Sequence, residues 1–172
     1  MGHPRGRRGS RRVVRGDAAR RRLPQGVSAT SDAVLRRRLI CLDTDVASAI
    51  MRPGGGPPQL GRRLGTLDPA LQFTTSITVG ELLYGAWKRR SKGLERDIER
   101  FVAGEIQIAD FDEAAARTYA EIRVELEAGG QRLEDADLRI AAICVAREFT
   151  LITGNVRHFE RVPGLRVENW LT

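Results

Sequence analysis

The chain has 172 residues, which is long enough for one domain with a sizeable hydrophobic core. Its formal net charge is +7, and no apolar run reaches the ~18–20 residues of a membrane span, so we expect no membrane partner. Cys41 and Cys144 both lie inside apolar runs, a pattern typical of buried free thiols in a reducing compartment. We therefore expect a cytoplasmic protein.

The positive charge is concentrated at the N-terminus. Residues 1–38 contain twelve arginines and two aspartates, a balance of about +10, which leaves about −3 for residues 39–172. Because this segment also lacks a hydrophobic period, we expect a disordered Arg-rich extension. It could serve as an RNA-binding arm or as a targeting segment, but we favour translated upstream sequence, with the true start near Val27 or Val34.

The rest of the chain, residues 39–172, alternates between strand and helix patterns in the manner of βα units. This alternation predicts one α/β domain with a parallel sheet. The predicted strands are 39–42, 71–77, 106–109, 150–153 and 165–167. Helices are predicted before Pro53, before Pro69, from Thr78 to about Arg90, over 95–103, from an N-cap at Asp112 to Gly129, and over 135–149.

Four acid or amide positions each follow a short apolar run. They are Asp43 in ICLDTDV, Glu81 in SITVGEL, Asp137 in EDADLRIAA and Asn155 in LITGNVRHF. The carboxyl ends of parallel strands open into one crevice, so residues this far apart in sequence can meet there. Converging carboxylates would repel one another unless a cation lay between them. The pattern predicts a divalent-metal site, and hence metal-assisted phosphodiester chemistry.

The first two positions also have structural explanations. An aspartate after a strand can cap the next helix, and Asp45 fits that role better than Asp43, which we expect to be the metal ligand. Thr78 and Glu81 have the spacing of a capping box, in which the glutamate would reach back to the N-cap amide. The other acids of the chain favour a site role for Glu81.

The last two positions have competing explanations as well. Asp137 could interact with the dipole of its helix, but Asp135 already suits the N-cap, so we expect Asp137 to be functional. Asn155 could be a turn residue in Thr-Gly-Asn. His158 is a lone histidine in a polar segment, which favours an exposed side chain over a ligand.

Four longer motifs contain these positions and cover most of residues 39–172. They are LDTDV at 42–46, SITVGELLYGA at 76–86, DLRIAAICVA at 137–146 and LITGNVRHFERVPGLRVENW at 151–170. In this order and spacing they resemble PIN-domain proteins. Within that superfamily they are most similar to the VapC-type toxins of bacterial toxin–antitoxin pairs.

The resemblance implies a PIN-like three-layer α/β/α fold with a central parallel sheet. It also implies hydrolysis of single-stranded RNA that depends on Mg²⁺ or Mn²⁺, a cognate antitoxin that blocks the site, and a homodimer. Asp43, Glu81 and Asp137 match the three most regular acids of the family. Asn155 stands where many PIN domains have Asp and many of these toxins have Asn, and a neutral ligand there would weaken a second metal subsite.

The substrate would need local positive charge because residues 39–172 are mildly acidic. Lys88, Arg89 and Arg90 at the end of the Glu81 helix, and Arg157 near Asn155, are candidates for RNA phosphate contacts. Ordinary solvated surface is an equally good explanation of these four side chains.

Two other functions fit parts of the sequence. ICLDTDV also resembles the nucleophile motif of haloacid-dehalogenase-like phosphatases, with Asp43 as nucleophile and Asp45 as general acid. That class needs a lysine in the site, and the only lysines, Lys88 and Lys92, lie in a polar helical stretch. The second alternative is a non-catalytic nucleic-acid-binding module that uses the Arg-rich tail.

Overall fold

The protein is built around one sheet in which all strands are parallel. The computed structural model describes residues 39–104 and 106–172, so the predictions for residues 1–38 lie outside the described residues. Five strands form one sheet in the order β3-β2-β1-β4-β5, which confirms the predicted α/β class. The strands are β1 (Ile40–Leu42), β2 (Gln72–Thr75), β3 (Gln107–Ala109), β4 (Thr150–Ile152) and β5 (Arg166–Glu168).

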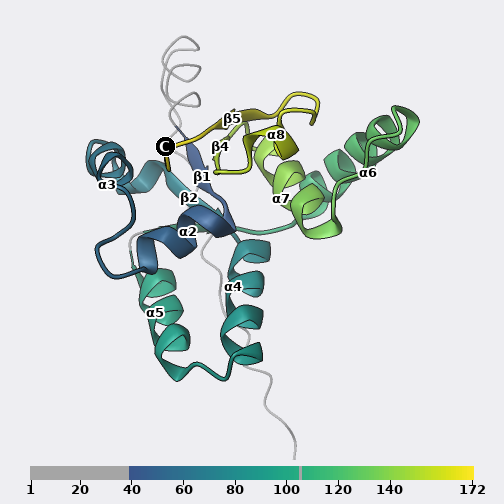
Figure 1. The fold of residues 1–172 in the computed structure, drawn as a ribbon. Helices are drawn as coiled ribbons and strands as arrows, with labels where there is room; N and C mark the ends of the chain where they lie inside the picture. Colours follow the sequence, from purple (N-terminus) through teal and green to yellow (C-terminus); the bar gives the residue numbers. More distant parts are fainter. Residues whose placement is uncertain (1–38, 105) are drawn as a thin grey trace, which may run out of the picture.

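Helices connect successive strands, as crossovers between parallel strands require. They are α2 (Thr44–Met51), α3 (Pro58–Gly65), α4 (Ser76–Lys88), α5 (Lys92–Ala103), α6 (Glu113–Ala128), α7 (Asp135–Ala146) and α8 (Val156–Phe159), with a 3₁₀ turn, η1, at Pro69–Leu71. Figure 1 shows α6 and α7 on one side of the strands and α3 on the other, while α4 and α5 form a hairpin that extends away from the sheet. None of the described helices is long and apolar enough to cross a bilayer.

The central strand β1 is buried on both faces, which is why its sequence is apolar without alternation. Cys41 packs with Leu151 in the cluster that α6 and α7 cover. Ile40, Leu42 and Ile152 pack on the opposite face, against α2, α3 and the C-terminal Trp170. These two clusters make the three layers that the sequence predicted.

A third cluster joins the α4–α5 hairpin to α2. Leu82 and Ala86 of α4 pack with Ile98 of α5 and Ala47 of α2, and all four side chains are buried. The hairpin is thus fixed to the helix that follows β1. The helix α4 starts directly after β2, at the carboxyl end of that strand, and runs outward from the sheet (Figure 1).

The predicted helix boundaries were wrong at three places. The helix predicted over 95–103 begins at Lys92, after an N-cap at Ser91. The strand predicted over 71–77 ends at Thr75, and α4 begins at Ser76 instead of Thr78, because the Thr75 hydroxyl caps the helix by accepting from the Thr78 amide at 2.9 Å. The helix predicted to reach Phe149 ends at Ala146, since Glu148 has a φ of 57° and cannot continue a helix.

The predicted ends of α6 are confirmed. The Asp112 carboxylate accepts from the Ala115 amide at 3.0 Å as the N-cap, and Gly129 is the C-cap. Ile122 and Leu126 are buried against α7, as the predicted apolar stripe requires. The long helix α6 therefore packs against α7 and supports the helix that carries Asp137.

Candidate active site

Asp43 lies at the centre of the candidate site because of the register of the sheet. Leu42 of β1 pairs with Ile152 of β4, so the residues that follow them, Asp43 and Thr153, are neighbours at the carboxyl ends of the two strands. The Thr153 hydroxyl donates to Asp43 Oδ2 at 2.7 Å, and the Thr44 amide donates to Oδ1 at 2.8 Å. Asp43 is therefore the N-cap of α2, and the prediction that Asp45 caps this helix was wrong.

The Asp43 carboxyl is buried among other acids. Its pKa is raised to about 6, chiefly by burial; the hydrogen bonds from Thr153 and Thr44 oppose this rise, and the nearby Asp45 and Asp137 add to it. Only 6% of the residue is exposed. A carboxylate that is ionised here at neutral pH costs free energy, and a cation beside it would remove that cost.

Asp45 faces the same loop from the first turn of α2. Its Oδ2 accepts from the Gly154 amide at 2.8 Å, and its Oδ1 is buried without a hydrogen-bond partner among the described residues. A Cβ on Gly154 would lie 2.8 Å from Asp45 Oδ2, so only glycine permits this approach. The arrangement joins α2 to the loop after β4, and it leaves one buried acceptor oxygen with unused capacity.

Glu81 reaches the site from the second turn of α4. The Thr44 hydroxyl donates to Glu81 Oε2 at 2.5 Å, so Glu81 lies against the N-terminus of α2, next to Asp43. The capping-box explanation was wrong, because Thr75 is the N-cap and Thr78 is already inside the helix. Glu81 is thus placed by tertiary contact and not by helix capping.

Asp137 enters from the first turn of α7. The N-cap of this helix is Glu134, without a side-chain hydrogen bond, so the assignment of Asp135 to that position was wrong. Burial raises the pKa of Asp137, and His158 opposes that shift. Its Oδ2 lies 2.8 Å from His158 Nε2, which is within hydrogen-bonding distance, although the direction departs from an ideal N–H···O bond.

His158 is part of the site, so the prediction of an exposed side chain was wrong. Its side chain is 25% exposed, and its Nδ1 lies 2.9 Å from Arg161 Nη2. Arginine can only donate, so Nδ1 is the acceptor and the neutral ring carries its proton on Nε2, which faces Asp137. Arg161 Nε also donates to the His158 carbonyl at 2.9 Å, which fixes the pair.

Asn155 is the N-cap residue of α8, and its side chain makes no capping bond. Its amide N–H donates to the Thr153 hydroxyl at 3.0 Å, the same hydroxyl that donates to Asp43. Asn155 is exposed, and no described residue hydrogen-bonds its side-chain amide. The backbone of Asn155 is therefore tied to the site, while the side chain stays available to a ligand.

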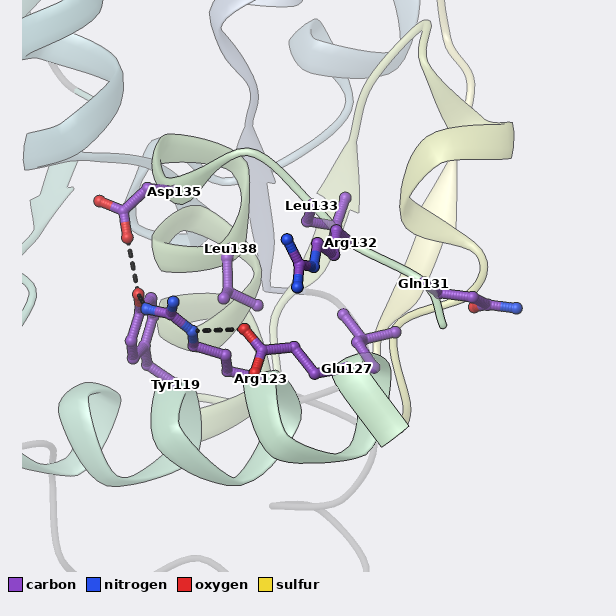
Figure 2. A pocket seen from close by; sticks show the side chains of 9 residues that line it. Tyr119, Arg123, Glu127, Gln131, Arg132, Leu133, Asp135 and Leu138 are labelled. Carbon is purple, nitrogen blue, oxygen red and sulfur yellow. Dashed lines mark hydrogen bonds and ion pairs between the residues drawn. The ribbon is translucent and has the colours of Figure 1, made fainter. Parts of the chain in front are cut away.

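Asp135 belongs to a separate pocket between α6 and α7. This pocket has a volume of about 130 Å³, a floor that includes Leu126 and Leu138, and a polar rim (Figure 2). Asp135 accepts from the Tyr119 hydroxyl at 2.6 Å, and the Tyr119 oxygen accepts from Arg123 at 2.8 Å. The polar rim is thus largely paired within itself, and Asp135 does not contribute to the acidic centre.

The donor set of the acidic centre suits a hard divalent cation, because it offers carboxylate and amide oxygens. The unused Asp45 oxygen and the raised pKa of Asp43 also fit a cation. Among the described residues, no three acidic, histidine or cysteine side chains surround a single point. Glu81 and Asp137 would have to turn from Thr44 and His158 to share one ion with Asp43.

The surrounding partners were not predicted from the sequence. The acids are contacted by Thr44, Thr153 and His158, and Arg161 in turn contacts His158. Of these contacts, only that between His158 and Arg161 could be suggested by sequence spacing, since the two residues are three apart. The pairing of Asp43 with Thr153 depends on the register between β1 and β4, which the sequence alone does not reveal.

Comparisons with known proteins agree with this geometry. The PIN-domain family matches residues 40–165. The tRNA(fMet)-specific endonuclease VapC of Shigella flexneri is 36% identical over 132 residues, which cover 75% of this chain and 96% of that protein. The corresponding endonuclease of Salmonella typhimurium is 35% identical over 116 residues, covering 66% and 86%.

Solved structures give the same result. The DNA-bound VapBC from Salmonella typhimurium superposes with a TM-score of 0.67 at 32% identity, over 76% of this chain and 97% of that one. VapBC2 from Rickettsia felis, bound to a promoter DNA fragment, gives a TM-score of 0.66 at 30% identity, over 76% and 98%.

Proposed function

Because this chain belongs to the PIN-domain family, we propose that it is a VapC-type toxin that hydrolyses single-stranded RNA and is inhibited by a cognate antitoxin. The observation that supports this proposal is the buried Asp43 carboxyl at the end of β1, with Asp137 near enough to raise its pKa and with Glu81 hydrogen-bonded to the adjacent Thr44. Thr153 contacts Asp43, and His158 contacts Asp137. The match to the VapC endonuclease of Shigella flexneri covers 96% of that protein.

The acids are proposed to hold Mg²⁺ or Mn²⁺. Asp43, Glu81 and Asp137 would bind the ion directly or through water, and Asn155 would help to orient it. When bound, such an ion acidifies an attacking water and neutralises charge on the scissile phosphate, so no covalent intermediate is required.

The chain's own residues have defined tasks in this proposal. Thr153 holds Oδ2 of Asp43 and so orients this carboxylate before substrate arrives. Thr44 keeps Glu81 beside the N-terminus of α2, from where its carboxylate would turn toward the ion. His158 presents its Nε2 proton to Asp137. Arg157 is exposed on α8, next to His158 in the sequence, and is the candidate for a contact to the RNA phosphate.

The proposed partners follow from the structural neighbours. Several solved neighbours are VapBC toxin–antitoxin complexes, including VapBC-1 from nontypeable Haemophilus influenzae at a TM-score of 0.67. This supports a cognate antitoxin for this chain. A homodimer remains part of the proposal.

The phosphatase alternative has little support from the site. It needs a lysine beside Asp43, but Lys88 lies over the exposed Tyr84 ring and Lys92 pairs with Glu95 at 2.7 Å. Asp45, its proposed general acid, is engaged by the Gly154 amide. The alternative that uses the Arg-rich tail concerns residues outside the described part of the chain.

The proposal is tested by incubating the purified protein with single-stranded RNA. We expect cleavage with Mg²⁺ or Mn²⁺, no cleavage after EDTA, and loss of at least about 100-fold in rate for Asp43→Asn. Glu113→Gln is the matched control, since Glu113 is an exposed acid of α6 whose ion pair within the described ranges is with Arg117 on its own helix. Equal cleavage by Asp43→Asn, or full activity in EDTA, would contradict the proposed site.

A further inference from the structure

We propose that the exposed face of α4 is a stacking platform for single-stranded RNA that leads to the acidic centre. The platform consists of Gly80, Tyr84, Trp87 and Lys88. This inference rests on the proposed ribonuclease function and names the surface that would hold the substrate. It adds base stacking to the phosphate contacts already considered for the cations of this helix.

The platform lies next to the site residue Glu81 and continues along one side of α4. Tyr84 and Lys88 follow Glu81 at i+3 and i+7, so the three side chains share one stripe of α4. Tyr84 is 64% exposed and Trp87 is 60% exposed, which is unusual for such large side chains in a described fold with three buried clusters. An RNA strand that lies along this stripe would reach Glu81 at one end of it.

Both aromatic rings are held by their surroundings but remain open to a ligand. The indole Nε1 of Trp87 donates to Glu95 Oε1 of α5 at 3.1 Å, so an edge contact positions the ring. The ammonium group of Lys88 lies 5.5 Å from the centre of the Tyr84 ring. Rings that are fixed in this way lose little entropy when a base stacks on them.

The charge of the platform suits an anion. Lys88, Arg89 and Arg90 are consecutive, and none of them pairs with a carboxylate within the described part of the chain. A second copy of the chain docked on this face would bring two such cationic groups together. Exposed aromatics next to unpaired cations are instead the combination that binds single-stranded nucleic acid, because bases stack on the rings and phosphates contact the cations.

Gly80 supports a close approach of the strand. It is exposed, precedes Glu81 directly, and a Cβ added to it would meet nothing within 4 Å. Glycine inside a helix is less favourable than alanine, and no packing within the described residues requires it here. The missing side chain leaves open helix surface beside Glu81, where RNA backbone could lie.

Tryptophan fluorescence provides a direct test of this platform. The chain has two tryptophans, and Trp170 is only 6% exposed, so quenching by an added ligand reports mainly on Trp87. The protein is titrated in EDTA with a 2′-O-methyl single-stranded oligonucleotide, which is not cleaved. We expect saturable quenching by this strand and at least about tenfold weaker binding of the matching duplex, whose bases are already paired.

Variants then separate the contributions, with binding measured by anisotropy of a labelled strand. Tyr84→Ala and Trp87→Ala should each weaken binding about fivefold or more, and Trp87→Phe should keep most of the affinity. Lys88→Ala should reduce the slope of log K against log salt by ~0.7. Gly80→Ala should fold normally and still bind more weakly. Val124→Ala on α6, at a position that is 70% exposed, is the control and should change nothing.

The outcomes distinguish this inference from the proposed function. Unchanged binding by Tyr84→Ala and Trp87→Ala, in a protein that still cleaves RNA, would overturn the platform alone. Equal affinity for duplex would also overturn it. A change from dimer to monomer in these variants, measured by light scattering, would assign the face to contact between copies and overturn the inference. A wild-type protein that neither binds nor cleaves RNA would contradict the proposed function itself.

Discussion

Asp43 has opposite effects on stability and on the proposed activity. Its carboxyl is held in a buried position by Thr153 and Thr44, which fixes it in one orientation at the end of β1. Burial raises its pKa to about 6, so ionisation in the folded protein is unfavourable. A buried carboxylate that lowers stability when it is charged is typical of functional sites, and a cation bound beside it would offset that cost.

Because the buried Asp43 carboxyl lowers stability when it ionises, we predict a pH-dependent effect of Asp43→Asn on the free energy of unfolding. The pKa in the folded protein lies above the ordinary value of 3.8, so the stability contributed by the protonated carboxyl is fully present below about pH 4. It is lost as the pH rises through about 6. Asparagine cannot ionise but still caps α2, so in EDTA the variant should become more stable than wild type by on the order of 1–3 kcal/mol above pH 7.

Urea unfolding of both proteins in EDTA at pH 4.5 and pH 7.5 measures this effect. The difference in unfolding free energy should be small at the lower pH and larger at the higher pH, in favour of the variant. A difference that is the same at both pH values would show that Asp43 ionises without cost.

His158 should act through Asp137. His158→Leu removes the Nε2 proton that faces Asp137 Oδ2, while His158→Gln keeps an N–H donor on a chain of similar reach. Loss of such an outer partner of a metal ligand typically costs 10–100-fold, so the leucine variant should lose about that much RNA cleavage and the glutamine variant clearly less.

Nitrogen-15 NMR of the imidazole provides a second readout for His158. The wild-type ring should carry its proton on Nε2, because Arg161 donates to Nδ1, and Arg161→Leu should allow both tautomers. Equal activity of the leucine and glutamine variants, or a proton found on Nδ1, would exclude this role.

At the scale of elements, the sequence placed most helices and strands correctly but misplaced the starts of α4 and α5 and the end of α7. Asp112 and Gly129 bound α6 as predicted, because capping there is local in the sequence. In α4 two threonines compete as caps, Thr75 and Thr78, and the choice depends on where β2 leaves the sheet. The capping-box spacing with Glu81 was therefore misleading, since Glu81 is occupied by Thr44 of another helix.

Thr75→Ala tests the structural assignment of this cap. The Thr75 hydroxyl accepts from the Thr78 amide and contacts the Thr78 hydroxyl at 3.0 Å, and both side chains are fully buried. Removing it should lower the unfolding free energy by about 1–2 kcal/mol. Thr66→Ala, at an exposed hydroxyl that donates to the Arg63 carbonyl, is the control and should cost about 0.5 kcal/mol or less in thermal or urea unfolding. Equal losses in the two variants would contradict the assignment.

At the scale of the whole molecule, the strand order explains why distant residues meet. The sheet has β1 at its centre, with β2 on one side and β4 on the other, so the residues that follow these three strands share one edge. Hydrophobic patterns were sufficient to predict that Asp43 lies where β1 ends and that α4, which carries Glu81, starts directly after β2. They were not sufficient to predict the threonine and histidine partners, which depend on register and on the packing of α2 and α8.

The central proposal is that this protein is a ribonuclease toxin whose effect requires Asp43, the acid at the end of β1. The most direct test is growth of bacteria on induced expression of wild type, Asp43→Asn and the Glu113→Gln control, with soluble protein levels measured for all three. We predict growth arrest by wild type and by the control, and normal growth with Asp43→Asn. Arrest by Asp43→Asn at the same protein level would contradict the central role of this acidic centre.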